Sequence, residues 1–194
     1  MGDTLPMNKI EFLIIFISMV FGYAMSEYLK GIVFLIKSNR DIKEYPIHIS
    51  WQILIFFMAI HYWWTFYRFS DHIAENLALF ILALSIPFLY FIIIKLLFPS
   101  EDEIRFYKGE MTGYFQKVRN KIYLSIAALY MLYSIVLNVW GYETLSDFNV
   151  MIRTTLAMQF VLAALINRKL MDYIALLGTI GVLVYFSLLR FSIR

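Results

Sequence analysis

The chain has 194 residues and a formal net charge of +3; 61% of its residues are hydrophobic and only 16% are charged. Soluble domains average about 45–50% apolar and about 25% charged residues, so this composition indicates a membrane protein. The sequence contains no cysteine, which excludes disulfides, thiolate metal sites, iron–sulfur clusters and thiol catalysis.

Six long apolar runs fill most of the chain. Each holds about 18 residues or more, enough for a helix rising about 1.5 Å per residue to cross a hydrocarbon core of about 30 Å. In lipid such runs become helices because the backbone must satisfy its own hydrogen bonds. We therefore predict an all-α six-transmembrane-helix bundle that forms a single transmembrane domain over residues 1–194. The predicted helices are 10–36, 46–67, 77–98, 122–139, 148–166 and 173–189.

Basic residues gather in three loops that fall on the same side of any six-span topology. These loops hold 10 of the 17 Lys and Arg residues, namely Lys37, Arg40, Lys43, Arg105, Lys108, Lys117, Arg119, Lys121, Arg168 and Lys169. The positive-inside rule places such loops in the cytoplasm. We therefore expect a multi-pass protein with both termini outside.

The predicted helix 10–36 carries two polar patterns. Ser18, Gly22 and Ser26 recur every four residues, a stripe that lets another helix approach closely, either within the bundle or in a second copy of the chain. Glu27 and Lys30 lie three residues apart, close enough to pair. Because ionisable groups inside a span are expensive, Glu27 is expected to face the bundle interior. The pair is then an ion or proton pathway, a ligand contact, or a structural salt bridge at the cytoplasmic end.

The predicted helix 46–67 has aromatic residues near both ends. Trp51 and the run 61–67 indicate two interfacial aromatic belts. His61 begins the second run, where a histidine can carry a proton or ligate a metal or haem. It can equally be an interfacial histidine that is hydrogen-bonded beside Trp63 and Trp64. Since a single histidine does not specify a ligand, we predict no metal site and no cofactor.

Two residues stand out in the later helices. Pro87 lies inside the predicted helix 77–98 and should kink it. Arg153 lies about one turn inside the predicted helix 148–166. It can snorkel outward, pair with Glu143 or Asp147, or bind a substrate.

The segment 99–121 is the one sizeable loop. Ser100 followed by three acidic residues predicts an N-cap and the first turn of an amphipathic helix over about 100–116. Its mixture of aromatic and basic residues suits a helix lying on anionic lipids at the cytoplasmic face, and a docking site for a cytoplasmic protein partner would look the same. The basic residues of this predicted lipid or partner surface are Arg105, Lys108, Lys117, Arg119 and Lys121.

Several aromatic and glycine positions in the first half of the chain form a recognisable set. They are Gly22-x6-Leu29-x-Gly31, Trp51, Trp63-Trp64 and Leu97-Phe98-Pro99. Together they resemble a recurring pattern in a functionally uncharacterised family of bacterial six-span inner-membrane proteins of about this length. The resemblance implies a location in the bacterial inner membrane and no catalytic residue.

Function is predicted from the class of protein rather than from a catalytic motif. The predicted spans lack the paired acids or nucleophile–base pairs that membrane hydrolysis requires, so we do not expect an enzyme. A small bundle with a tight-packing stripe and ionisable groups predicts a homo-oligomeric ion or proton channel or pore-forming component, for example in a stress or antiphage response. Its predicted pathway residues are Glu27, Lys30 and His61. The alternative is a membrane-embedded sensor or scaffold that binds a partner through 99–121; nucleic acid is not an expected partner.

Overall fold

The computed structural model describes residues 8–37, 45–68, 77–139 and 147–192. They form the helices α1 (Lys9–Lys37), α2 (Pro46–Arg68), α3 (Leu77–Leu97), α4 (Glu101–Phe106), α5 (Met111–Val139), α6 (Phe148–Leu165) and α7 (Lys169–Ser192). All but α4 are long and apolar enough to cross a membrane. The predicted all-α bundle with six membrane helices is confirmed, and the chain is a multi-pass membrane protein. Arg40, Lys43 and Glu143 lie outside the described residues.

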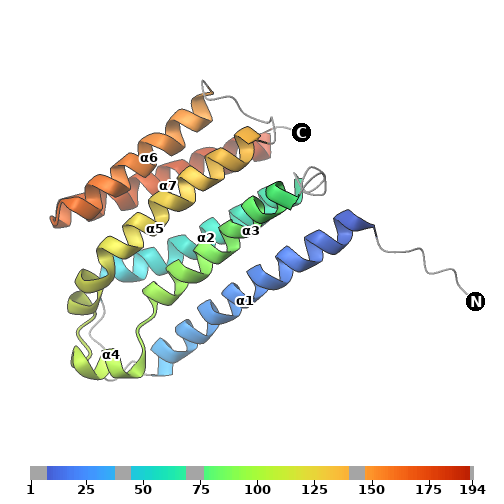
Figure 1. The fold of residues 1–194 in the computed structure, drawn as a ribbon. Helices are drawn as coiled ribbons and strands as arrows, with labels where there is room; N and C mark the ends of the chain where they lie inside the picture. The colour runs from blue at the N-terminus through green and yellow to red at the C-terminus, as the bar shows by residue number, and fades with distance from the viewer. Residues whose placement is uncertain (1–7, 38–44, 69–76, 140–146, 193–194) are drawn as a thin grey trace, which may run out of the picture.

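The six long helices form two layers (Figure 1). α1, α3, α5 and α6 lie side by side in that order, and α2 and α7 form a second layer behind them. α2 packs against α3, α5 and α7. α1 packs most closely on α3 and also contacts α2 through side chains, since the Tyr28 hydroxyl donates to the Gln52 carbonyl at 3.2 Å. The start of α1 and the end of α7 lie at one end of the bundle, and α4 lies at the other (Figure 1). Those basic residues of the predicted cytoplasmic loops that the structure describes therefore share the end that carries α4.

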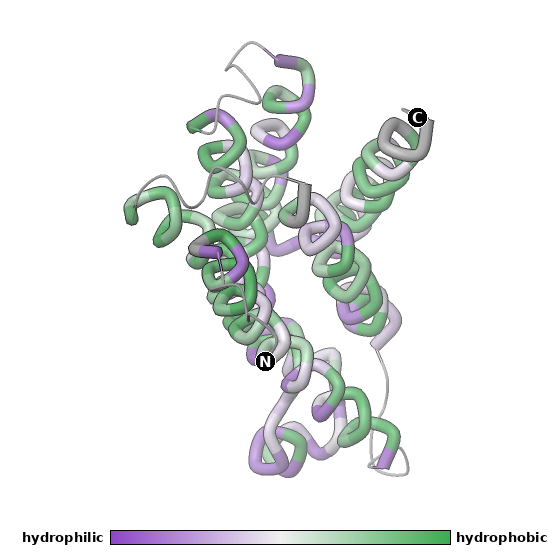
Figure 2. Tube along the Cα trace, turned by 90° about the vertical axis from the view of Figure 1, so that its right-hand side faces the viewer, coloured by the Kyte–Doolittle hydropathy of each residue, from purple (hydrophilic) through white to green (hydrophobic). Residues whose placement is uncertain are grey.

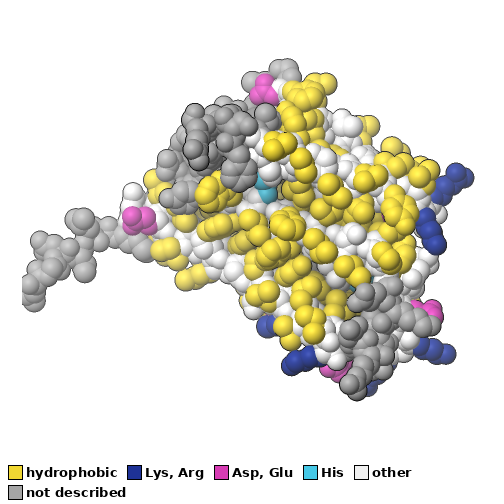
Figure 3. Space-filling model, turned by 180° about the vertical axis from the view of Figure 1, so that it is seen from behind, with side chains coloured by type: hydrophobic (Ala, Val, Ile, Leu, Met, Phe, Trp, Pro, Cys, Tyr) yellow, Lys and Arg dark blue, Asp and Glu magenta, His cyan; other side chains and the backbone are white. Residues whose placement is uncertain are grey.

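Apolar side chains cover much of the outer surface, as expected where lipid is the solvent. Met19 of α1 is 67% exposed, Trp64 of α2 63% and Leu177 of α7 66%. Figure 2 shows hydrophobic stretches along the long helices, with hydrophilic residues at many of their ends. The face in Figure 3 is largely hydrophobic, and its Lys and Arg side chains lie toward the margins.

The buried end of α3 explains two of the motifs in the first half of the chain. Pro99 stops the helix, and its last carbonyl groups accept hydrogen bonds from side chains of other helices. His48 Nε2 lies 2.6 Å from the Leu97 carbonyl oxygen, and the Tyr114 hydroxyl donates to the Leu96 carbonyl at 3.0 Å. The Phe98 ring lies against Gly31, where an added Cβ would be only 2.3 Å from Phe98 Cγ. Gly31 thus lets α1 and the end of α3 approach closely.

Pro87 lies inside α3, as predicted, and a side chain of α2 replaces the backbone hydrogen bond that this proline removes. Proline has no N–H, so the carbonyl of Ala83, four residues earlier, lacks its usual helical donor. The Tyr62 hydroxyl of α2 donates to that carbonyl oxygen at 3.3 Å. In a membrane, where water cannot reach the backbone, this cross-helix bond replaces the lost one.

Three predictions for the central segments are wrong. The amphipathic helix 100–116 ends after α4, because a turn with positive φ at Lys108 (50°) and Gly109 (76°) separates it from α5. α5 begins at Met111 rather than 122. Tyr114 and Phe115, two aromatic residues of the predicted surface helix 100–116, are buried against the bundle rather than on lipid. The predicted N-cap at Ser100 is confirmed, and the structure adds a capping box with Glu103. The cause of the error is that hydropathy marks the membrane-embedded part of a helix, not its polar extension.

Trp51 does not belong to an interfacial belt. It is fully buried, with its ring edge-to-face with Tyr123 of α5 at 5.6 Å and with Phe160 of α6 at 5.5 Å between centroids. These three rings form an aromatic layer between α2, α5 and α6. The prediction failed because aromatic rings that contact one another are as stable in a bundle core as at the lipid headgroups.

Candidate functional site

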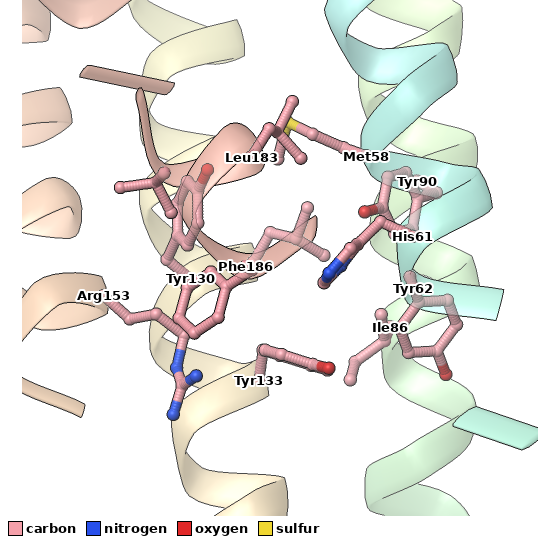
Figure 4. Close-up of a pocket in the computed structure, with 12 residues that line it drawn as sticks. Met58, His61, Tyr62, Ile86, Tyr90, Tyr130, Tyr133, Arg153, Leu183 and Phe186 are labelled. Atoms are coloured by element: carbon pink, nitrogen blue, oxygen red, sulfur yellow. The ribbon is translucent and has the colours of Figure 1, made fainter. Parts of the chain in front are cut away.

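A small cavity lies among α2, α3, α5, α6 and α7, with a volume of about 50 Å³. Its lining combines apolar residues with His61 of α2, Arg153 of α6 and four tyrosines, Tyr62, Tyr90, Tyr130 and Tyr133. Figure 4 shows His61 reaching in from α2 and, below it, the Tyr133 hydroxyl extending from α5 toward Ile86 of α3. A cavity that holds a water needs about 10–15 Å³, so this one has room for a few small groups.

Arg153 enters the cavity wall because α6 faces α5 at this level. The side chain is 2% exposed, although it lies in a membrane-spanning helix. Its Nε donates to Ser134 Oγ of α5 at 3.0 Å. The guanidinium also lies over two rings, 5.4 Å from the centroid of Tyr133 and 5.6 Å from that of Phe186. Of the predicted alternatives, outward snorkelling is therefore excluded.

The tyrosine hydroxyls of the cavity have different surroundings. Tyr62 is bonded to the Ala83 carbonyl, as described above. The Tyr133 hydroxyl oxygen is buried and has no hydrogen-bond partner among the described residues. A buried hydroxyl without a partner costs about 1–3 kcal/mol, so it needs an explanation from the site.

A second buried polar cluster lies nearer the α4 end of α5. Arg119 Nε donates to Asp172 Oδ1 of α7 at 2.6 Å, and the Tyr123 hydroxyl donates to the same oxygen at 2.9 Å. Arg119 also donates to the Ile166 carbonyl at 3.1 Å. Arg119 is 1% exposed, so its predicted place on a lipid or partner surface is wrong. The early start of α5 turns this residue inward, where an acid of α7 neutralises it.

The predicted pair of Glu27 and Lys30 is confirmed at 2.7 Å, and Lys95 of α3 binds the other carboxylate oxygen. The Glu27 side chain is 11% exposed, whereas Lys30 is 67% and Lys95 54% exposed. The carboxylate thus lies in the seam between α1 and α3, with its two cations at the surface. No contact among the described residues joins this cluster to His61, so the predicted pathway residues do not form one route.

The other predicted surface residues lie outside the bundle core. Arg105, Lys108, Lys117 and Lys121 are exposed at the α4 end. In the predicted small-residue stripe, Gly22 and Ser26 are exposed and Ser18 is half-buried. A Cβ added at Gly22 would meet no atom within 4 Å. The stripe therefore faces away from the rest of its own chain.

Several site residues were missed in the sequence, although a pattern marks them. Tyr123, Tyr130 and Ser134 were missed; they follow Arg119, which was predicted at the surface, at spacings of four, seven and four, and all four lie on one face of a helix. Asp172 was missed because it lies at the start of an apolar run, where an acidic residue reads as a loop boundary. Within the described residues no three His, Asp or Glu side chains lie close enough to hold a metal ion.

Comparisons with protein-family models, curated proteins and solved structures find no match. The resemblance to an uncharacterised bacterial family therefore stays a prediction.

Proposed function

We propose that the protein moves protons or small ions across the bacterial inner membrane, as a channel or pore-forming component rather than as an enzyme. The observation that supports this most is the polar face of α5. It carries two buried clusters, one around Arg119 and Asp172 and one around Ser134 and Arg153. Ionisable groups buried in membrane helices are retained against a free-energy cost, and they commonly mark ion and proton pathways.

The aromatic layer between these clusters acts as a closed gate in this proposal. Phe160 stacks on Tyr130 at 5.9 Å and contacts Tyr123 at 5.8 Å between centroids. Tyr123 and Tyr130 lie seven residues apart, about 10 Å along the helix. An apolar constriction of this kind blocks conduction by excluding water until its side chains move.

Flux into liposomes tests this function, with Phe160→Ala as the decisive variant. The shorter side chain opens the aromatic layer, so we expect proton or ion flux to rise at least about tenfold under an applied potential. Phe12→Ala is the matched control, because Phe12 is 53% exposed on α1 and touches no part of the gate. We expect its flux to equal that of the original chain.

Removal of a polar group from the route gives a second, independent variant. Ser134→Ala in the Phe160→Ala background should lower the flux again, since it removes the partner of Arg153 Nε. Monodisperse elution of each variant shows that it is folded. Flux equal to that of protein-free liposomes in the original chain and in Phe160→Ala alike would refute the proposal.

The orientation and assembly belong to the same proposal. We place the α4 end in the cytoplasm, both termini outside, and Arg105, Lys108, Lys117 and Lys121 at anionic lipid headgroups. The outward stripe on α1 is the surface on which we propose that copies of the chain associate. Assembly of this kind suits a component of a stress or antiphage response.

One observation favours the alternative of a sensor or scaffold. Phe106 of α4 is 76% exposed between the exposed basic residues Arg105 and Lys108. An aromatic residue among cations at the cytoplasmic end suits a docking contact with a protein partner. Phe106→Ala distinguishes the two functions, because it should abolish partner binding in a scaffold and leave flux unchanged in a channel.

A further inference from the structure

A groove runs between α2 and α7 on the outside of the bundle, with a volume of about 630 Å³. Ten residues line it, and all are apolar except His61 and Ser187. Phe57 and Trp64 of α2 and Val184 of α7 are more than half exposed along it. All of these residues belong to helices that can cross the membrane. The groove therefore opens on hydrocarbon, and a hydrocarbon chain is what the bilayer offers it.

The groove leads to the polar cavity described above. His61 and Leu183 line both spaces, so these two side chains form the boundary between the hydrocarbon and the interior. In the cavity behind them lies the Tyr133 hydroxyl, which is buried without a hydrogen-bond partner among the described residues and lies below the His61 ring in Figure 4. This hydroxyl is a donor in need of an acceptor, and none of the surrounding apolar residues supplies one.

Size and charge limit what the cavity can accept. A space of about 50 Å³ admits a head of a few atoms rather than a ring system. None of the described residues that line it is acidic, and the Arg153 guanidinium lies 5.4 Å from the Tyr133 ring. Figure 4 shows the guanidinium on the side of this ring away from the hydroxyl, so Arg153 acts on a group bound at the hydroxyl through its electric field and not by contact. A positive charge at this range, together with a hydroxyl donor, favours an anionic oxygen acceptor.

We propose that the groove between α2 and α7 binds a long-chain carboxylic acid from the bilayer, with its chain in the groove and its carboxylate at Tyr133 and His61. This inference goes beyond the proposed ion movement and does not depend on it. The carboxylate would accept the Tyr133 hydrogen bond under the field of Arg153. The groove would bury the chain without any polar contact.

Quenching of tryptophan fluorescence tests the site, because Trp64 lines the groove. A dibrominated stearic acid should quench the detergent-solubilised full chain saturably. Its methyl ester, which has the same chain and no charge, should bind about tenfold more weakly. Tyr133→Phe should weaken binding of the acid about tenfold and weaken binding of the ester less, since the carboxylate loses a charge-assisted hydrogen bond and the ester carbonyl only a neutral one.

Two matched valines separate the groove from the general lipid surface. Val184 of the groove is 51% exposed and Val33 of α1 49%. Val184→Phe fills the groove and should weaken acid and ester alike, whereas Val33→Phe should change neither. Equal binding of acid and ester by the original chain, or unchanged acid binding in Tyr133→Phe, would overturn the proposal: the cavity would then hold water and the groove any lipid chain.

Discussion

Two glycines of α1 that belong to the same sequence motif have opposite surroundings. Gly31 lies under the Phe98 ring, and Gly22 faces away from the chain. The motif therefore combines a glycine that the fold needs with one that it does not. Glycine is unfavourable in a helix by about 1 kcal/mol relative to alanine, and at Gly22 no atom of the described chain lies close enough to require it.

Gly31→Ala is expected to lower the free energy of unfolding by about 1–3 kcal/mol, because its methyl group would overlap the Phe98 ring. Gly22→Ala is the control and should be neutral or slightly stabilising. Thermal unfolding in detergent measures both. Equal melting temperatures for the two variants would contradict the close contact between Gly31 and Phe98.

Gly22→Leu tests assembly in the same helix. A larger side chain should lower the mass of an oligomer that uses the stripe while the monomer keeps its melting temperature, since no atom of the chain lies within 4 Å of an added Cβ. Light scattering in detergent measures the mass. An unchanged mass would remove this stripe from any contact between copies.

Asp172 neutralises the most deeply buried cation of the α4 end. Asp172→Asn leaves Arg119, which is 1% exposed, without its counter-ion, and should destabilise the protein by about 3–5 kcal/mol. Asp102→Asn, at an exposed position of α4, should change stability by less than about 0.5 kcal/mol. Denaturant titration in mixed micelles compares the two variants. A similar small effect in both would mean that the buried ion pair contributes little.

At the scale of helices, the sequence predicts where membrane-spanning segments lie, because lipid requires long apolar runs there. It predicts few of the contacts between helices. The starts of α2, α3 and α6 lie at the predicted residues, because Pro46 and the apolar runs mark them. α5 was predicted to start too late, since its first turns are polar and cross no hydrocarbon. The pairing of Arg119 with Asp172 joins residues 53 positions apart, and no local pattern specifies it.

In the candidate site, too, single residues could be predicted from the sequence and most of their contacts across helices could not. His61 and Arg153 were recognised singly because polar residues are conspicuous in apolar helices. Their common cavity depends on α2 and α7 lying in one layer, which the order of the helices in the chain does not reveal. Glu27 and Lys30 were correctly paired because three residues along one helix fix their separation.

The bond between Tyr62 and the carbonyl of Ala83 is expected to matter only while Pro87 is present. Tyr62→Phe should destabilise the chain by about 1 kcal/mol. In a Pro87→Ala background the same change should have a smaller effect, because the alanine N–H can donate to that carbonyl. A double-mutant cycle measures the difference. Additive effects would show that the two residues act independently.

For the molecule as a whole, the absence of cysteine in the sequence makes topology simple to measure. A single cysteine at Lys108 should resist a membrane-impermeant thiol reagent in intact cells and react once the membrane is opened. A single cysteine at Asn8 should react in both conditions. Both residues are exposed at opposite ends of the bundle. The reverse labelling pattern would place the basic loops outside.

The arrangement of α1 beside α3 and of α2 beside α7 has a consequence for synthesis of the protein. A chain that enters the membrane from its N-terminus delivers α2 long before α7, the helix that covers it. Until α7 has been made, the side of α2 that carries His61 contacts lipid or the insertion machinery. Over the same period Arg119 lacks its counter-ion Asp172. A ribosome stalled before Lys169 should therefore hold an unfinished, protease-sensitive bundle, because the helix that packs on α2 has not yet been made.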